Sequence, residues 1–236
     1  MTEVRDVMKE LQSLGSAQTI KTYRNHGAHG DMYGVKLQDL KKIAKRLRGQ
    51  QSVALELWDT NNSDAMYLAS LVADGALMKT SQLNHWAKSA WWYLLSEHAV
   101  PSVAVENLKA AELALKWLAS KSDHIVSSGW CTYSMLLSVR QDADLDLANV
   151  ENLLRSIPGK IADAPNRVRY CMNSYVISVG GYVKPLLKTA KTIARQIGKV
   201  EVDVGATSCK VPVAWDYIAK IESMGRVGKK RKTAKC

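Results

Sequence analysis

Phenylalanine is absent from this chain of 236 residues, and the sequence offers no physical reason for that absence. Cysteine is scarce: four cysteines stand at positions 131, 171, 209 and 236, and no two have Cys-x-x-Cys spacing. That spread argues against a zinc site and against a disulfide framework, so neither a metal nor a cofactor is expected. It favours a reduced, intracellular setting, and we expect a cytoplasmic protein.

Long apolar runs are also missing. No stretch approaches the length that a bilayer requires, so no membrane partner is expected. The first residues carry Glu3, Arg5, Asp6 and Lys9, which excludes a signal peptide there. Apolar residues still make up 47% of the chain, enough for a sizeable core.

Acidic residues are missing from positions 226–236, which hold six lysines and arginines. Residues 36–48 likewise hold six basic side chains against Asp39 alone. These two patches together account for the whole net charge of +11, so the rest of the chain is formally neutral. Such concentration is typical of a protein that binds a polyanion. The other interpretation is a solvated helix face followed by a flexible tail.

Apolar residues recur at helical spacing along most of the chain. They predict about eleven helices of roughly 8–18 residues, paired at intervals of roughly 35–45 residues. We therefore expect an all-α, right-handed HEAT-like solenoid over residues 1–198. In the basic helix within 36–48, Leu37, Leu40, Ala44 and Leu47 are expected to face the core.

The pattern changes after Gly198. Residues 199–204 alternate with period two, which predicts a short β-hairpin. A last helix should then complete a unit spanning 199–224, packed on the same domain. The remaining residues, 225–236, are expected to form a basic, flexible tail.

Residues 84–98 hold three of the seven tryptophans and read as one helix. In an α-helix Trp91 and Trp92 would point about 100° apart, so both cannot face the core in the same direction. They either fill a helix interface or form a surface on which bases stack. The loop 25–34 has glycines and histidines but lacks the pattern of a phosphate loop or metal site, and we expect a plain connection.

Four stretches resemble a known family when taken together. Residues 33–36 (YGVK), 55–60 (LELWDT), 68–74 (LASLVAD) and the tryptophans of 86–92 are similar to those of AlkD-type DNA alkylation repair proteins. The resemblance covers roughly 36–196, and the end of the chain looks like a branch with a basic extension. It implies a HEAT-like DNA-binding protein, and for active members a glycosylase that excises N3- or N7-alkylated purines.

This sequence departs from the active members at two positions. Where they have a catalytic Asp, four residues after the second Trp, this chain has Ser96. Where they use an Arg on a later repeat, it has Ser128 or Gly129. A carboxylate stabilises the positive charge that builds on the sugar as the base leaves, and a serine dipole does this far less well.

We therefore expect a DNA-binding protein that recognises damaged or branched DNA as a monomer, with little or no base excision. The alternatives are an active alkylpurine glycosylase, with Glu97 or another acid replacing the missing Asp, and a protein–protein scaffold. The residues expected to contact DNA are Lys36, Lys41, Lys45, Arg48, Trp91, Trp92, Ser96, Arg167, Arg169, Lys210, Lys229, Lys230, Arg231 and Lys232.

Overall fold

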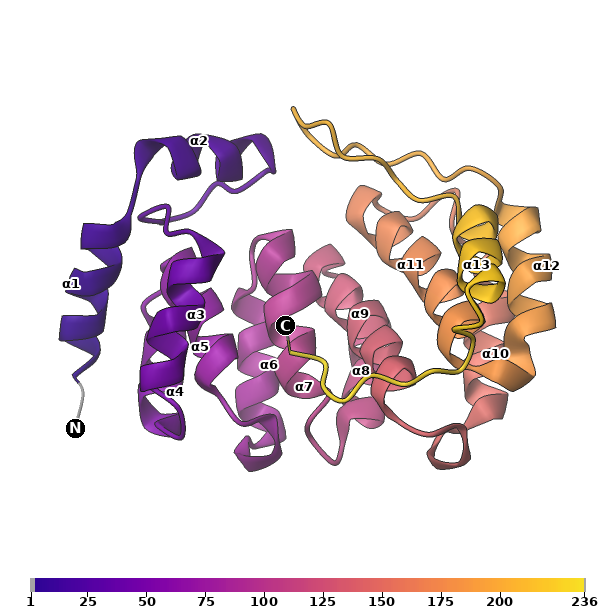
Figure 1. The fold of residues 1–236 in the computed structure, drawn as a ribbon, viewed down its shortest axis with the longest axis horizontal. Coiled ribbons are helices and arrows are strands. Elements are labelled where there is room, and N and C mark those ends of the chain that lie inside the picture. The colour runs from indigo at the N-terminus through magenta and orange to yellow at the C-terminus, as the bar shows by residue number, and fades with distance from the viewer. Residues whose placement is uncertain (1–2, 236) are drawn as a thin grey trace.

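The computed structural model describes residues 3–235, and its regular elements are all helices, with α1 and α13 near opposite ends of an elongated stack (Figure 1). The helices of the first half are α1 (Val4–Leu14), α2 (Ala17–Asn25), α3 (Leu37–Arg46), α4 (Gln51–Asp59), α5 (Ser63–Val72), α6 (Thr80–Ser89) and α7 (Val100–Ala104). Those of the second half are α8 (Ala110–Leu118), α9 (Asp123–Val139), α10 (Leu147–Ser156), α11 (Asn166–Tyr182), α12 (Leu187–Ile197) and α13 (Ala214–Ser223). Short 3₁₀ turns lie at Gly75–Leu77, Asp142–Asp144 and Lys184–Leu186. The expected all-α class is confirmed.

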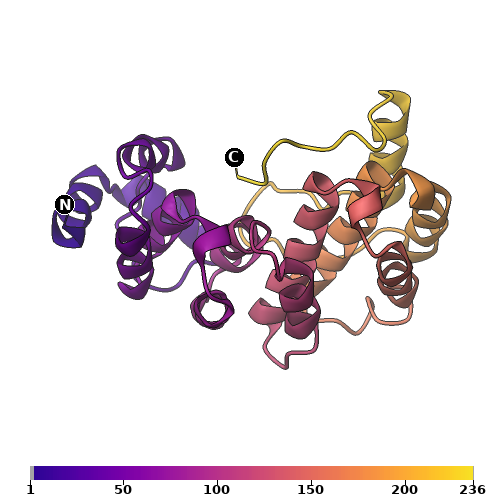
Figure 2. The ribbon, with the colours of Figure 1, turned by 90° about the horizontal axis from the view of Figure 1, so that it is seen from below.

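Two large apolar cores run through the stack, one in each half, beside a third, small cluster around Val105 and Leu136. The first includes Trp58 and Trp86, whose rings stack 4.1 Å apart and nearly parallel. Such a pair adds about 0.5–1.5 kcal/mol beyond the area it buries. The second core centres on α9 and α11, with Tyr175 fully buried. Helix α8 contributes to both cores, so it joins the halves seen in Figure 2.

The tryptophan-rich stretch is not the single helix that we expected. Helix α6 ends at Ser89, the chain breaks at Trp91 and Trp92, and a π-helix follows over Leu94–Ala99. Because of the break, the two indole rings lie almost parallel, 6.3 Å apart, and both face the loop after α2. One continuous α-helix would have pointed them in different directions.

The β-hairpin expected after Gly198 is wrong, because the described residues contain no β-strand. The valines do alternate inward, but Val200 and Val202 pack on the second helical core. Backbone groups of the segment bind side chains instead of a partner strand: Asp203 N donates to Asn166 Oδ1, and Asn166 Nδ2 donates to Asp203 O, both at 2.8 Å. We call residues 199–213 the arm.

The arm leaves α12 and doubles back over the helices, with its far end toward α2 (Figure 1). At its tip Gly205 has a φ of 75°, and a Cβ there would overlap the carbonyl oxygen of Asn25. A glycine is therefore needed both for the turn and for the close approach. The arm thus connects the C-terminal half of the stack with the end of α2.

The basic tail, expected to be flexible, lies against the helices in this structure. Arg231 N donates to Ser138 O at 2.7 Å, and Gly228 N donates to Gly181 O at 2.9 Å. The side chain of Lys230 is only 8% exposed, with its Nζ 2.8 Å from both Asp142 Oδ1 and Leu137 O. Residues 226–235 therefore cross from α13 toward α7 (Figure 1).

Candidate nucleic-acid interface

Helix α3 presents a buried side and a cationic side, as its sequence predicts. Leu40, Ile43 and Leu47 are buried, whereas Leu37, expected in the core, is 37% exposed. This first-turn residue lies at the edge of the apolar stripe, and Ile43 occupies the core position instead. The stripe is therefore shifted toward Ile43, and the cations remain in water.

The cations of this segment fall into two groups. Lys42 pairs with Asp39 at 2.7 Å, and Arg46 pairs with Glu10 at 2.5 Å. The other four cations of residues 36–48 are exposed and have no ion pair among the described residues. They are the four that were expected to contact DNA: Lys36, Lys41, Lys45 and Arg48. Three of them line one groove.

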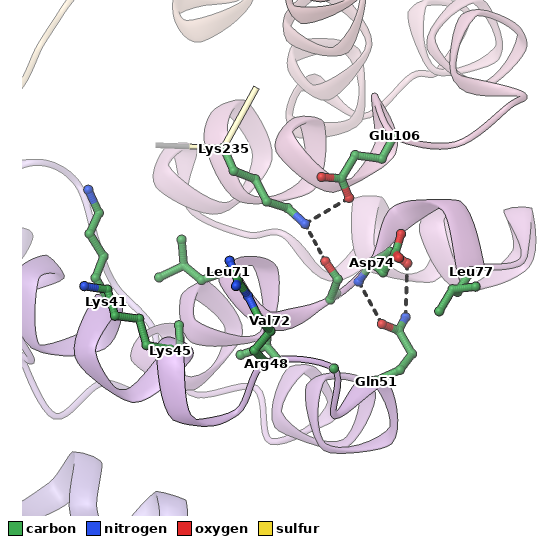
Figure 3. Close-up of a pocket in the computed structure, with 13 residues that line it drawn as sticks. Lys41, Lys45, Arg48, Gln51, Leu71, Val72, Asp74, Leu77, Glu106 and Lys235 are labelled. Carbon is green, nitrogen blue, oxygen red and sulfur yellow. Dashed lines mark hydrogen bonds and ion pairs between the residues drawn. The ribbon is translucent and has the colours of Figure 1, made fainter. Parts of the chain in front are cut away.

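This groove, which we call the basic groove, has a volume of about 590 Å³ and lies between α3, the end of α5 and the end of the tail (Figure 3). Lys41, Lys45 and Arg48 line it from the α3 side. Lys235 enters from the tail, where its Nζ contacts Glu106 Oε2 at 2.9 Å and also donates to Ala73 O. The two basic segments that lie far apart in the sequence therefore meet at one surface.

A second pocket, of about 290 Å³, is aromatic, and the arm contributes part of its lining. Trp92 is 4% exposed and donates from Nε1 to His26 O at 2.9 Å, so its ring is part of the core. Trp91 is half-buried, and its ring packs on His29 at 4.9 Å. The other lining residues are His26, Gly27, Tyr93, Asn166, Arg167, Asp203, Val204 and Gly205. Of the two expected stacking residues, only Trp91 retains a partly open ring.

Glu97, the expected substitute carboxylate, is committed to a buried ion pair. Its side chain is 2% exposed, and Arg167 Nε donates to Glu97 Oε1 at 2.8 Å while Arg167 Nη2 binds the other oxygen. Burial raises the pKa of Glu97, and the hydrogen bonds and charge of Arg167 oppose that rise. Arg167, expected to touch a phosphate, also lies over the Tyr93 ring at 4.3 Å.

Glu97 lies within the π-helix Leu94–Ala99, whose i→i+5 bonding, as from Val100 N to Leu95 O, widens the turn. Its carboxylate is bound by Arg167, which lines the aromatic pocket. An uninterrupted α-helix was expected through this stretch, and the break at Trp91 and Trp92 removes that basis for placing Glu97.

The two substituted positions of the resemblance lie in contact with each other. Ser96 is buried, and its hydroxyl donates only to Trp92 O, at 3.3 Å. Ser128 is also buried, and its hydroxyl donates to Ser96 O at 2.7 Å. The expected places of a carboxylate and a guanidinium thus hold two serines, neither of which is open to a ligand. This position of Ser96 gives no support to its expected contact with DNA.

The remaining expected contacts are dispersed over the C-terminal half. Arg169 is half-buried, and its Nε is buried without a hydrogen-bond partner among the described residues. Lys210 is exposed on the arm, and Lys229, Arg231 and Lys232 are exposed on the tail. Lys230, in contrast, is held by Asp142, so it serves the packing of the tail.

Several residues near the aromatic pocket were missed by the sequence analysis. Tyr93, Asn166 and Asp203 line it together with Trp91. Cys131 and Cys171 are far apart in the sequence, but their sulfurs lie 3.5 Å apart beside Glu97. No local motif marks these residues, because adjacent helices and the arm bring them together. Only the richness of 84–98 in aromatics pointed to the area.

The fold and the two sites define a HEAT-like helical protein with a cationic groove and an aromatic pocket. The sequence pattern of the DNA alkylation repair enzyme family matches residues 7–190, and this chain belongs to that family. The resemblance found in the sequence is thus confirmed.

The chain is also similar to a solved structure from a new family of proteins related to the HEAT-like repeat DNA glycosylases, with affinity for branched DNA structures. The TM-score is 0.91, the identity is 34%, and all of both chains is covered. Uncharacterised proteins of two Listeria species are similar too. Lin0241 of Listeria innocua is 37% identical over 217 residues, and Lmo0209 of Listeria monocytogenes is 36% identical over 217 residues. In both cases 89% of this chain and 93% of the relative are covered.

Among residues 3–235, no helix combines the length and the apolar character that crossing a membrane would need.

Proposed function

We propose that this protein binds DNA, with preference for damaged or branched structures, and removes bases slowly or not at all. The observation that carries the proposal is the basic groove, where Lys41, Lys45 and Arg48 line the α3 side without an ion pair in residues 3–235 and the tail contributes Lys235. Phosphates are the anions that such a set of lysines and arginines recognises in nucleic acids. The affinity of the structurally similar protein for branched DNA supports the same function here.

Weak excision follows from the charges at the aromatic pocket. The charge of Glu97 is matched by Arg167, and Ser96 offers a buried dipole. Loss of a preorganised electrostatic group commonly lowers a catalytic rate by about two to three orders of magnitude. A base held at this pocket would therefore find neither Ser96 nor Glu97 available as the carboxylate that assists its departure.

Binding is tested by electrophoretic shift with plain duplex, duplex containing an alkylated base, and a four-way junction, each at several salt concentrations. Lys41→Ala/Lys45→Ala/Arg48→Ala should weaken binding and reduce the salt slope by about 2–3, because each phosphate contact contributes about 0.9. The matched control is Lys42→Ala/Arg46→Ala, which removes cations that are already paired on the same helix.

An unchanged slope in the triple variant would contradict a DNA contact in the groove. Salt-insensitive or absent binding to all three DNAs would contradict the proposed function and favour the protein–protein scaffold. A monomeric state and a cytoplasmic location remain predictions from the sequence.

One observation favours glycosylase activity as a second candidate. The carboxylate-bearing residue Asp203 lines the aromatic pocket from the arm, beside Trp91 and Tyr93. Release of 7-methylguanine or 3-methyladenine that is abolished in Asp203→Asn, but retained in Glu97→Gln, would establish this function. No release by the unaltered protein would rule it out for these bases.

A further inference from the structure

Two cysteines from neighbouring helices face each other beside the aromatic pocket. Cys131 on α9 and Cys171 on α11 have their sulfurs 3.5 Å apart. A disulfide bond is about 2.05 Å long, so the two sulfurs would have to move about 1.5 Å closer to form one. Both cysteines are free in this structure.

The two thiols differ in their environment. Cys131 is half-buried, whereas Cys171 is fully buried, and burial raises the pKa of the Cys171 thiol. A soluble reagent therefore meets Cys131 first, and Cys171 stands behind it as the second thiol. Cys209 is exposed, and no other cysteine is in contact with it within residues 3–235.

Glu97 completes the cluster, since its carboxylate and both sulfurs lie within 4.8 Å of one another. Two thiols and a carboxylate are also a set of ligands that zinc accepts. Here, however, both oxygens of Glu97 are bound by Arg167, and a metal would have to break that buried ion pair. Joining the two sulfurs leaves the pair intact, so the geometry favours oxidation over metal binding.

We propose that Cys131 and Cys171 are a reversible redox pair that forms an intramolecular disulfide on reaction with a low-molecular-weight disulfide. The Cys131 thiolate attacks the reagent, forms a mixed disulfide and releases one thiol. The Cys171 sulfur then attacks the Cys131 sulfur and releases the second thiol, which takes up the proton of Cys171. In total, the reagent's disulfide and the two cysteine thiols are converted to the Cys131–Cys171 disulfide and two thiols of the reagent. The protein is oxidised and the reagent is reduced.

The bond has a consequence at the aromatic pocket. Cys171 is one turn after Arg167 on α11, and its sulfur lies within 4.8 Å of a Glu97 carboxylate oxygen. A disulfide removes both S–H groups and links α9 to α11 beside the Glu97–Arg167 pair. Oxidation therefore alters the surroundings of the residues that position Arg167. This inference stands on the cysteine geometry alone and does not depend on DNA binding.

The test treats the full-length reduced protein with oxidised glutathione, then alkylates free thiols and maps peptides by mass spectrometry. We expect a linked pair of peptides containing Cys131 and Cys171, lower in mass by two hydrogens than the two separate peptides, and complete reversal by a dithiol reductant. Cys209 is exposed and has no partner thiol among the described residues, so it should carry at most a glutathione adduct and no internal link.

Three variants sharpen the result. Cys171→Ser should accumulate the glutathione adduct on Cys131, because the second thiol is missing. Cys131→Ser should form no internal bond and no adduct at position 131, and Cys209→Ser should form the Cys131–Cys171 bond as the unaltered protein does.

Links formed only through Cys209 or Cys236, or no linked peptide at all, would overturn the proposal. Reduced protein that retains a stoichiometric zinc ion and resists oxidation until a chelator is added would overturn it too, in favour of a metal site.

Discussion

Arg167 and Glu97 form a buried ion pair. The sequence had predicted a DNA contact for Arg167 and, in the glycosylase alternative, a catalytic role for Glu97. Removing one member of a buried ion pair leaves the other charge uncompensated. Glu97→Gln should therefore lower the free energy of unfolding by about 3 kcal/mol, measured by urea denaturation. Glu112→Gln is the matched control: its ion pair with Lys109 is largely exposed and should contribute about 0–1 kcal/mol.

A loss as small as in the control would contradict a structural ion pair at Glu97. Glu97→Gln/Arg167→Met should recover part of the loss, because it removes both charges together.

Gly30 holds Trp91 in place by having no side chain. A Cβ at this position would overlap the indole ring of Trp91. Gly30→Ala should displace the ring, lower stability by about 1–3 kcal/mol and change tryptophan fluorescence. Gly159→Ala is the control, because a Cβ there meets nothing within 4 Å. Equal effects of the two substitutions would show that Trp91 does not depend on this contact.

The arm is the segment for which the prediction from sequence, a β-hairpin, was wrong. Its alternating valines pack on helices, and Asn166 replaces the missing partner strand by bonding Asp203 twice. Asn166→Ala should free the arm and speed tryptic cleavage after Lys199 and Lys210, followed by gel electrophoresis. Asn149→Ala, which removes a bond to Tyr133 away from the arm, should leave cleavage unchanged. Cleavage that is equally fast in both variants would contradict the role of Asn166.

Some basic side chains of the tail pack against the helices, and others are exposed to solvent. Lys230 and Lys235 are engaged with Asp142 and Glu106, which leaves Lys229, Arg231 and Lys232 as its exposed expected contacts. Substituting these three by alanine should reduce the salt slope of DNA binding by about 2–3 if the tail touches phosphates. A slope equal to that of the unaltered protein would show that these three residues contact no phosphate.

At the scale of the whole molecule, we expect a single chain to be the functional unit. The basic groove and the aromatic pocket are each built within one chain. Light scattering during gel filtration should therefore give the mass of one chain with and without DNA. A dimer mass in the absence of DNA would contradict the prediction. The right-handed sense of the stack and the boundaries at 198 and 224 also stay predictions.

The sequence by itself determined the helical class, the family and the basic character of two segments. These properties are local: apolar spacing in 36–48 sets the inner and outer sides of α3, and charge density needs no partner to be recognised. Helix existence follows from such periodicity, whereas the position of a break does not. The interruption at Trp91 and Trp92 arises because the loop after α2 receives both rings.

Only the tertiary structure decided which of these residues meet. It brought the tail's end to α3, paired Glu97 with Arg167 across seventy positions, and placed Cys131 against Cys171. The physical reason is that burial and ion pairing depend on long-range contacts, which are set by the packing of whole helices. Some of the basic residues therefore hold the tail in place through ion pairs, as Lys230 and Lys235 do. Others, such as Lys41 and Lys45, remain exposed and available to bind an anion.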